Sequence, residues 1–129
     1  MIKFLTKELT LFFHEDLIQK YGGSPGVRDE NLLDSALAQP KSMFGGKYLN
    51  KSIFEKAAAY GYHLCQNHPF IDGNKRIALV VMYTFLYVNG YDVKLSEKQA
   101  YLLIMSIADG SLSKQELANY LKENSFKIK

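Results

Sequence analysis

The sequence lacks several features that would assign it to common classes of protein. Its 129 residues include a single cysteine, Cys65, so no disulfide can form within the chain, which favours a reducing compartment. The N-terminal segment has neither a clean apolar core nor a small-residue cleavage site, so we expect no signal peptide. The longest apolar run, residues 77–88, spans about twelve residues, whereas a membrane helix needs about 20. We therefore expect a cytoplasmic protein that does not enter a membrane.

A large excess of charge of one sign is also missing. The formal net charge is +3, and 47% of the residues are hydrophobic and 22% charged, which is ordinary for a globular protein. The weak positive balance slightly favours anionic ligands but does not indicate nucleic acid, and we expect no direct nucleic-acid partner. No repeat, low-complexity tract or linker interrupts the chain, so its length predicts a single domain over residues 1–129.

Helical signals run through the whole chain. Apolar residues recur at helical spacing in residues 6–21 until Gly22-Gly23, and a second helix is predicted from Asp29 to Pro40. Capping boxes, in which a serine and a Glu or Gln three positions later satisfy orphan amides, predict three more helix starts: Ser52/Glu55, Ser96/Gln99 and Ser113/Glu116. A further helix, about 74–89, is apolar nearly all round and should be buried. The sequence thus predicts an all-α fold, a compact single domain of about six helices around a central buried helix.

The segment HPFIDGNKRIAL, residues 68–79, carries the side chains from which a reactive site could be built. Pro69 excludes helical geometry at the preceding residue, so His68 should end a helix or lie just beyond it. An imidazole there can take a proton from a hydroxyl near neutral pH. Asp72 is a lone carboxylate in the loop, and such a group beside phosphates usually holds Mg²⁺, which keeps most of its waters. The segment therefore predicts a base beside a magnesium ligand.

Two cations stand where this helix begins, and they indicate an anion. The positive end of the helix dipole disfavours Lys75 and Arg76 there by about 0.3–1 kcal/mol each. The amides of Gly73, Asn74 and Lys75 would form an anion nest, a concave group of N–H donors at a helix N-terminus. Asn74 could cap the helix or brace the loop, and Arg76 can bind phosphate oxygens bidentately. Together with His68, these residues predict a site for phosphoryl or nucleotidyl transfer.

Simpler explanations apply to each residue taken alone. A DGN segment is usually a turn, and a lone Lys-Arg pair is usually solvated, but six compatible residues within nine positions favour the functional interpretation. The other two histidines, His14 and His63, lie in no comparable cluster of polar residues. We expect His14 at the surface of the first helix. His63, Cys65 and His68 lack a fourth ligand and the usual spacing of a zinc site.

The motif HPFIDGNKR resembles the signature of the Fic/Doc family, and Lys75 resembles the Doc branch, because Fic enzymes have a second glycine at that position. The resemblance covers the whole chain, including YGGSPGVRDENLLDSALAQP. It implies a compact helical fold that transfers a nucleotide-derived phosphate group to a protein hydroxyl. It also implies that Phe70 anchors the loop in the core. By position, the resemblance implies His68 as the base, Asp72 as the Mg²⁺ ligand, Arg76 as a third catalytic residue, and phosphate binding by Gly73, Asn74, Lys75 and Arg76.

The resemblance to the Doc branch also implies cofactors, a target and a partner. It implies an ATP- and Mg²⁺-dependent kinase that phosphorylates a threonine of elongation factor Tu and so arrests translation. It further implies the toxin of a toxin–antitoxin pair, silenced by the disordered tail of an antitoxin similar to Phd. The inhibitory Ser/Thr-x-x-x-Glu-Gly/Asn helix of many Fic proteins has no counterpart in this sequence, so restraint should come from another protein.

Departures from the family pattern bear on the reaction. Leu79 stands where Fic enzymes usually carry a second arginine, which argues against AMP transfer, and Lys75 goes with a reversed nucleotide that offers its γ-phosphate. Val80 stands where the resemblance to the Doc branch leads us to expect a polar residue. Two alternatives remain open: a Fic-type AMP transferase on the same fold, and a non-catalytic helical binding module. The loop 40–51, rich in glycine and lysine, is expected to dock the target peptide.

Overall fold

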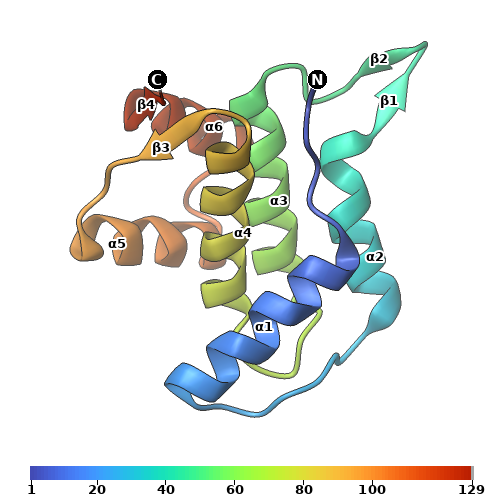
Figure 1. Ribbon diagram of the computed structural model, residues 1–129, viewed down its shortest axis with the longest axis vertical. Helices are drawn as coiled ribbons and strands as arrows, with labels where there is room; N and C mark the ends of the chain where they lie inside the picture. The colour runs from blue at the N-terminus through green and yellow to red at the C-terminus, as the bar shows by residue number, and fades with distance from the viewer. Residues whose placement is uncertain (129) are drawn as a thin grey trace.

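Six α-helices make up most of the computed structural model, which describes residues 1–128 (Figure 1). The helices are α1 (Lys7–Tyr21), α2 (Glu30–Ala38), α3 (Ile53–Asn67), α4 (Asn74–Val88), α5 (Glu97–Ala108) and α6 (Lys114–Glu123). Shorter elements are the 3₁₀ helix η1 (Gln39–Lys41) and the strands β1 (Met43–Phe44), β2 (Lys47–Tyr48), β3 (Tyr91–Val93) and β4 (Ser125–Lys127). The predicted all-α class is confirmed. The strands were not predicted, because two or three residues are too few to show a period of two.

Side chains cap the starts of five of these helices. Thr6 accepts from the amide of Leu9 at the start of α1, and Asp29 accepts from the amide of Leu32 at the start of α2. All three predicted capping boxes are present, at the starts of α3, α5 and α6. Such caps stabilise a helix by about 1 kcal/mol each. The exception is α4, where Gly73 occupies the N-cap position and no side chain caps the first turn.

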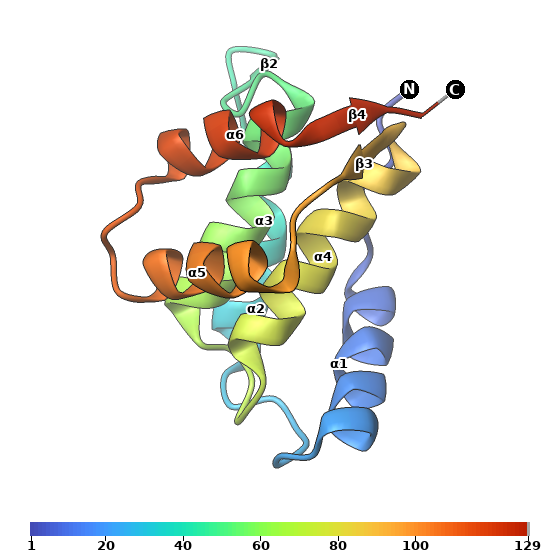
Figure 2. The same cartoon turned by 90° about the vertical axis from the view of Figure 1, so that its left-hand side faces the viewer.

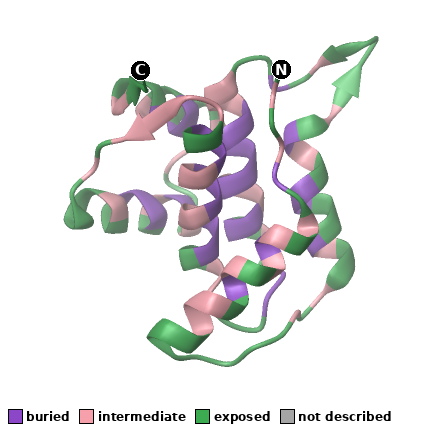
Figure 3. Cartoon of the chain, in the orientation of Figure 1, coloured by how far each residue is buried: buried purple, intermediate pink, exposed green. Residues whose placement is uncertain are grey.

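Two helices, α3 and α4, form the centre of the molecule, and Figure 3 shows buried residues along much of both. Eight of the fifteen residues of α3 and six of the fifteen of α4 are buried. The predicted central burial of α4 is therefore confirmed, but α3 shares that position. None of the helices within residues 1–128 is long and apolar enough to cross a membrane.

The residues between η1 and α3 form a hairpin instead of the irregular loop expected from the sequence. In this hairpin β1 pairs antiparallel with β2, with Met43 opposite Tyr48. Its turn residues, Gly45 and Gly46, have φ values of +59° and +79°, which the tight turns of two-residue hairpins require. The hairpin projects away from the helices (Figure 1).

Both ends of the chain lie near the C-terminal end of α4 (Figure 2). The last strand, β4, pairs antiparallel with β3, with Asp92 opposite Phe126. At the other terminus, the Asn89 side chain exchanges hydrogen bonds of 2.8 and 2.9 Å with the backbone of Lys3. The two termini are thus held at the end of α4 opposite the motif.

The connection between α1 and α2, residues 22–29, runs beside the motif loop between α3 and α4 (Figure 1). Val27 and Phe70 form an isolated antiparallel bridge. The amide of Arg28 donates to the carbonyl of Pro69 at 2.7 Å, and the amide of Ile71 donates to the carbonyl of Gly26 at 3.1 Å. Backbone hydrogen bonds between this connection and the motif loop therefore hold the loop in place.

Candidate active site

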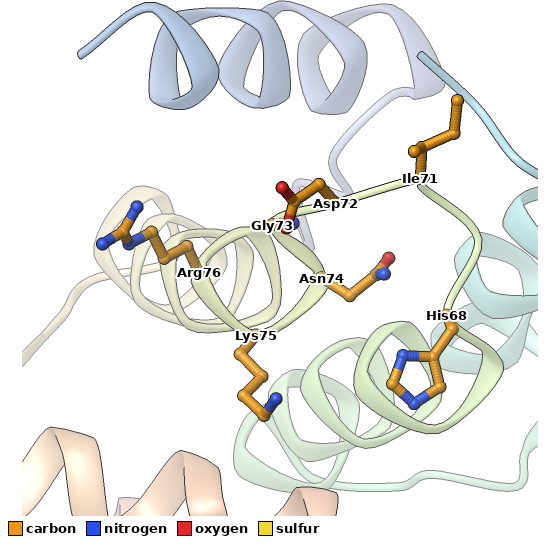
Figure 4. Close-up of a pocket in the computed structure, with 7 residues that line it drawn as sticks. All are labelled: His68, Ile71, Asp72, Gly73, Asn74, Lys75 and Arg76. Carbon is orange, nitrogen blue, oxygen red and sulfur yellow. The ribbon is translucent and has the colours of Figure 1, made fainter. Parts of the chain in front are cut away.

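The residues predicted as a site all line one open pocket of about 480 Å³ at the N-terminal end of α4 (Figure 4). The lining consists of His68, Ile71, Asp72, Gly73, Asn74, Lys75 and Arg76. The loop and the first turn of α4 thus bring together every residue singled out in the motif. Their chemical roles remain predictions.

His68 lies directly after α3, as Pro69 requires. It is the C-cap residue of α3, with φ 48° and ψ 55°, and the only non-glycine residue with positive φ in the described part of the chain. The left-handed conformation destabilises such a residue by roughly 1–2 kcal/mol. The Arg28 guanidinium stabilises the turn, because Nε donates to the carbonyl of His68 at 2.8 Å and Nη2 to that of Asn67 at 2.9 Å. The exposed imidazole is thereby carried on a fixed backbone.

Asp72 is exposed, and each of its carboxylate oxygens accepts a backbone hydrogen bond. Oδ1 accepts from the amide of Gly73 at 2.8 Å, and Oδ2 accepts from the amide of Ser24 at 3.2 Å. The Gly73 amide thus donates to Asp72 in this structure, and its place in the anion nest stays a prediction. The uncapped amides at the start of α4 are those of Asn74, Lys75 and Arg76, which precede the first intrahelical bond, from the Ile77 amide.

Asn74 braces the motif loop. Its Oδ1 accepts from the amide of Phe70 at 2.9 Å, and its Nδ2 donates to the carbonyl of Phe70 at 3.0 Å. Of the two roles considered for Asn74, bracing is confirmed and capping is excluded, because Gly73 is the N-cap residue. Phe70 itself is 1% exposed, which confirms it as a core anchor for the loop.

Lys75 and Arg76 are both exposed, and they leave the first turn of α4 on different sides (Figure 4). The Arg76 guanidinium lies over the ring of Tyr21 at the end of α1, with Cζ 4.6 Å from the ring centroid. Such cation–π contacts hold the cation without neutralising its charge. Within residues 1–128, neither cation forms a salt bridge with a carboxylate. Both charges therefore remain uncompensated beside the uncapped helix end.

His14, expected at the surface, is buried against the motif loop. It is 3% exposed, its Nε2 lies 2.7 Å from the Asp72 carbonyl oxygen, and its ring stacks on Phe70 with centroids 3.8 Å apart. The expectation fails because the buried positions of α1 are the polar residues Thr10 and His14, whereas the apolar Phe12 is 65% exposed. Leu9, Phe13 and Leu17 do pack against the core, so hydrophobic spacing finds much of the buried side of α1 but gives no sign of its two polar residues.

Sequence reasoning also missed the residues of the α1–α2 connection that touch the loop, namely Gly23, Ser24 and Arg28. A Cβ built on Gly23 would lie 2.7 Å from Asp72 Oδ2. These contacts join positions at least 39 residues apart, so no local pattern could have found them.

The fold and the pocket define a class: a helical protein whose two central helices meet at a polar loop with an uncapped, cationic helix start. A model of the Fic/DOC family matches residues 4–86, and the chain therefore belongs to the Fic/Doc family. It is 43% identical over 70 residues to a protein of Mycolicibacterium smegmatis called "Toxin Doc", a match that covers 54% of each chain. It is also 28% identical over 121 residues to "Protein kinase doc" of Escherichia phage P1, covering 94% of each chain.

Proposed function

We propose that this protein is a Doc-type toxin that transfers a phosphate group from ATP to a hydroxyl group of another protein. Family membership and the relatives called a toxin and a protein kinase support the proposal. The observation that carries it is the pocket itself. It combines the imidazole of His68, the carboxylate of Asp72 and an uncapped helix start flanked by Lys75 and Arg76.

In the proposed reaction, His68 removes the proton from the target hydroxyl. The hydroxyl oxygen bonds to the γ-phosphorus, and the bond from that phosphorus to the β–γ bridging oxygen breaks, so that ADP leaves. The uncapped amides at the start of α4, together with Lys75 and Arg76, stabilise the negative charge on the phosphate oxygens. The protein thus supplies one base and a set of pre-oriented positive groups.

The donor set of the pocket suits Mg²⁺ held jointly with a nucleotide. Within residues 1–128, no three His, Cys, Asp or Glu side chains gather closely enough to hold a metal by themselves. Asp72 offers a single exposed carboxylate, and Mg²⁺ typically uses one or two carboxylates plus phosphate oxygens and water. Mg²⁺ bound there would neutralise charge on the phosphates. We therefore propose Mg²⁺ and ATP as the cofactors and Asp72 as the metal ligand.

A threonine of elongation factor Tu is the target implied by the resemblance. Our candidate for docking it is the β1–β2 hairpin, which precedes α3 and so lies at the other end of that helix from the pocket (Figure 1). Phe44 and Met43 are 80% and 54% exposed, so the hairpin offers apolar side chains to an incoming peptide. Deleting Gly45 and Gly46 should abolish transfer to the target while ATP binding, measured by calorimetry, stays unchanged. Unchanged target modification would refute this docking role.

An antitoxin is proposed as the partner that restrains the toxin. It would be disordered until bound and would lay an amphipathic segment along this chain. Expression of the chain alone should arrest growth, and co-expression of the antitoxin from the neighbouring gene should restore it. Harmless expression of the folded chain without any antitoxin would contradict the proposal.

The experiment that tests the reaction uses purified protein, bacterial lysate and Mg²⁺, with γ-labelled ATP in one tube and α-labelled ATP in another. We expect a γ-labelled protein band that disappears in His68→Ala. An α-labelled band would instead establish AMP transfer, against which Leu79 argues, since it puts an apolar side chain where Fic enzymes carry a second arginine. If a lysate known to contain the target gave no band in either tube, the non-catalytic helical binding module would be the favoured alternative.

A further inference from the structure

We propose that His14 and Gly23 are positioning residues for Asp72, so that α1 and the segment following it determine where the metal-binding carboxylate stands. The inference rests on the proposed function, which makes Asp72 the Mg²⁺ ligand. Neither residue touches the nucleotide or the target in this proposal. Both act through Asp72, one on its backbone and the other on its side chain.

His14 fixes the backbone at Asp72. A carbonyl oxygen can only accept, so His14 Nε2 carries the hydrogen of the 2.7 Å bond to the Asp72 carbonyl. The ring is 3% exposed and stacks on Phe70 with an interplanar angle of 11°, so packing leaves it little freedom. Figure 1 shows α1 crossing the N-terminal half of α4 beside the loop. The donor thus stands on a rigid element, which suits a group that positions another.

Gly23 fixes the position of the carboxylate. Its backbone approaches Asp72 so closely that an added Cβ would lie 2.7 Å from Oδ2 and 3.2 Å from Cγ. The next amide, that of Ser24, donates to the same oxygen at 3.2 Å, and the Gly73 amide donates to Oδ1 at 2.8 Å. Carboxylate oxygens offer about four acceptor sites in total, so these two bonds leave sites for a cation. The glycine is needed for space as well as for its φ of +113°.

The chain provides a matched control for Gly23 at the neighbouring position. Gly22 also has a positive φ, +85°, but an added Cβ would have nothing within 4 Å. Gly22→Ala and Gly23→Ala therefore both strain the backbone, and only Gly23→Ala places an atom against Asp72. A difference between these two variants separates the contacts of the added methyl group, which meets Asp72 and, at 3.2 Å, Ile18 Cδ1, from the backbone strain.

A second pair of variants separates the hydrogen bond of His14 from its packing. Gln places its Nε2 near the position of the imidazole Nε2, so His14→Gln keeps a donor for the Asp72 carbonyl. His14→Phe keeps the stacked ring on Phe70 and removes the donor. If His14 only filled space in the core, His14→Phe would be the milder change.

The experiment measures the Mg²⁺ concentration that gives half-maximal transfer of the γ-label, with kcat and KM for ATP. Binding of Mn²⁺ to the protein in the presence of ATP is followed in parallel by electron paramagnetic resonance. We expect Gly23→Ala and His14→Phe to raise the Mg²⁺ concentration for half-maximal transfer, and to weaken Mn²⁺ binding, by about tenfold. Loss of groups that orient metal ligands has effects of roughly 10–100-fold. Gly22→Ala and His14→Gln should stay within about twofold of the parent.

Several results would overturn the inference. Thermal unfolding verifies that each variant is folded, and a folded Gly23→Ala or His14→Phe with the parent's Mn²⁺ binding would refute it. So would Gly22→Ala losing as much metal binding as Gly23→Ala. A parent that binds Mn²⁺ with ATP but transfers no label would contradict only the proposed function, because the order of the variants in Mn²⁺ binding would still decide the positioning role. A parent that binds no Mn²⁺ with ATP would overturn both.

Discussion

Individual residues hold the motif loop in a shape that its sequence alone would not keep. His68 adopts left-handed geometry, and Gly73 follows with φ +76°. The side-chain amide of Asn74 spans the turn between them, because it forms hydrogen bonds with both the backbone N–H and the backbone C=O of Phe70. Asn74 thereby acts on the loop as a brace, while the backbone amide beside it stays available at the helix start.

Replacing Asn74 by Ala should loosen this loop. The Phe70 N–H and C=O are partly buried, and leaving such groups unpaired destabilises by about 1–3 kcal/mol each. We expect a loss of about 2 kcal/mol in urea unfolding and a fall of at least about tenfold in label transfer. Asn74→Asp, which keeps only the acceptor, should fall between the parent and Asn74→Ala. Parent-like stability and transfer in Asn74→Ala would show that the brace is dispensable.

A second prediction at the residue scale concerns acid stability. Burial, together with the charge of Lys114, lowers the pKa of His63 to about 4. The unfolded chain therefore binds this proton more readily, so the stabilisation from neutral His63 is complete above about pH 6.5 and is lost as the pH falls toward 4. We expect the melting temperature to fall in this window.

The control for this pH effect is His63→Gln, which keeps a neutral acceptor near Lys114 Nζ, 3.4 Å from Nε2 in the parent. Its melting temperature should change less than that of the parent between pH 6.5 and 4.5. Carboxylates with lowered pKa values, such as Asp109 and Glu116, are common to both proteins and cancel in the comparison. Identical pH profiles would contradict the assignment to His63.

At the scale of secondary structure, the contact between α3 and α4 positions the site. The motif loop joins these two helices, so the loop's ends move only if the helices move. Gly61 on α3 allows the close approach, because a Cβ there would overlap the side chain of Met82 on α4. Both residues are fully buried, which leaves the thioether little space to withdraw.

Gly61→Ala should therefore destabilise the protein despite the higher helix propensity of alanine. Overpacking of a tight core costs about 1–3 kcal/mol, against a propensity gain of roughly 0.5–1 kcal/mol. We expect a net loss of about 1–2 kcal/mol in urea unfolding. The double variant Gly61→Ala/Met82→Val should recover part of it, because the smaller side chain relieves the overlap. A stabilised Gly61→Ala protein would show that the interface between α3 and α4 can accommodate an additional methyl group.

Across the whole molecule, the pocket and the chain termini lie at opposite ends of α4. The motif loop leads into the N-terminal end of α4, whereas β3, β4 and the N-terminal segment gather at its C-terminal end (Figure 2). The segment that joins β2 to α3 is held by Lys56, whose Nζ donates to the carbonyls of Asn50 and Lys51 at 2.6 and 3.0 Å. Changes in the contacts of the chain termini should therefore affect stability without affecting the chemistry.

Asn89→Ala tests this separation. It removes the bonds to Lys3 and one of 2.7 Å to the carbonyl of Phe85, so we expect a loss of about 1–3 kcal/mol in stability. Hydrogen exchange of residues 1–5 should accelerate. Label transfer should stay within about twofold of the parent at a temperature where both proteins are folded. A parallel fall in transfer would mean that the two ends of α4 are coupled.

The parts of the fold that the sequence predicted are those with local causes. The serine of each capping box lies three residues from its partner, so the starts of α3, α5 and α6 could be read directly. The position of His68 beyond α3 followed from its neighbour Pro69, and the concentration of polar residues in the motif identified the pocket. The two-stranded pairs escaped prediction because each strand is too short to leave a pattern.

The sequence by itself determined the helices, the turn at His68 and the composition of the pocket, because each depends on residues within about four positions of one another. Tertiary structure decided that the polar residue His14 is buried on α1 and which residues support the loop. The bond from His14 to the Asp72 carbonyl spans 58 positions, and that from Arg28 to the His68 carbonyl spans 40. Contacts over such separations form only when the packed helices bring distant segments together, and a polar residue such as His14 gives no hydrophobic sign of the side on which it will lie.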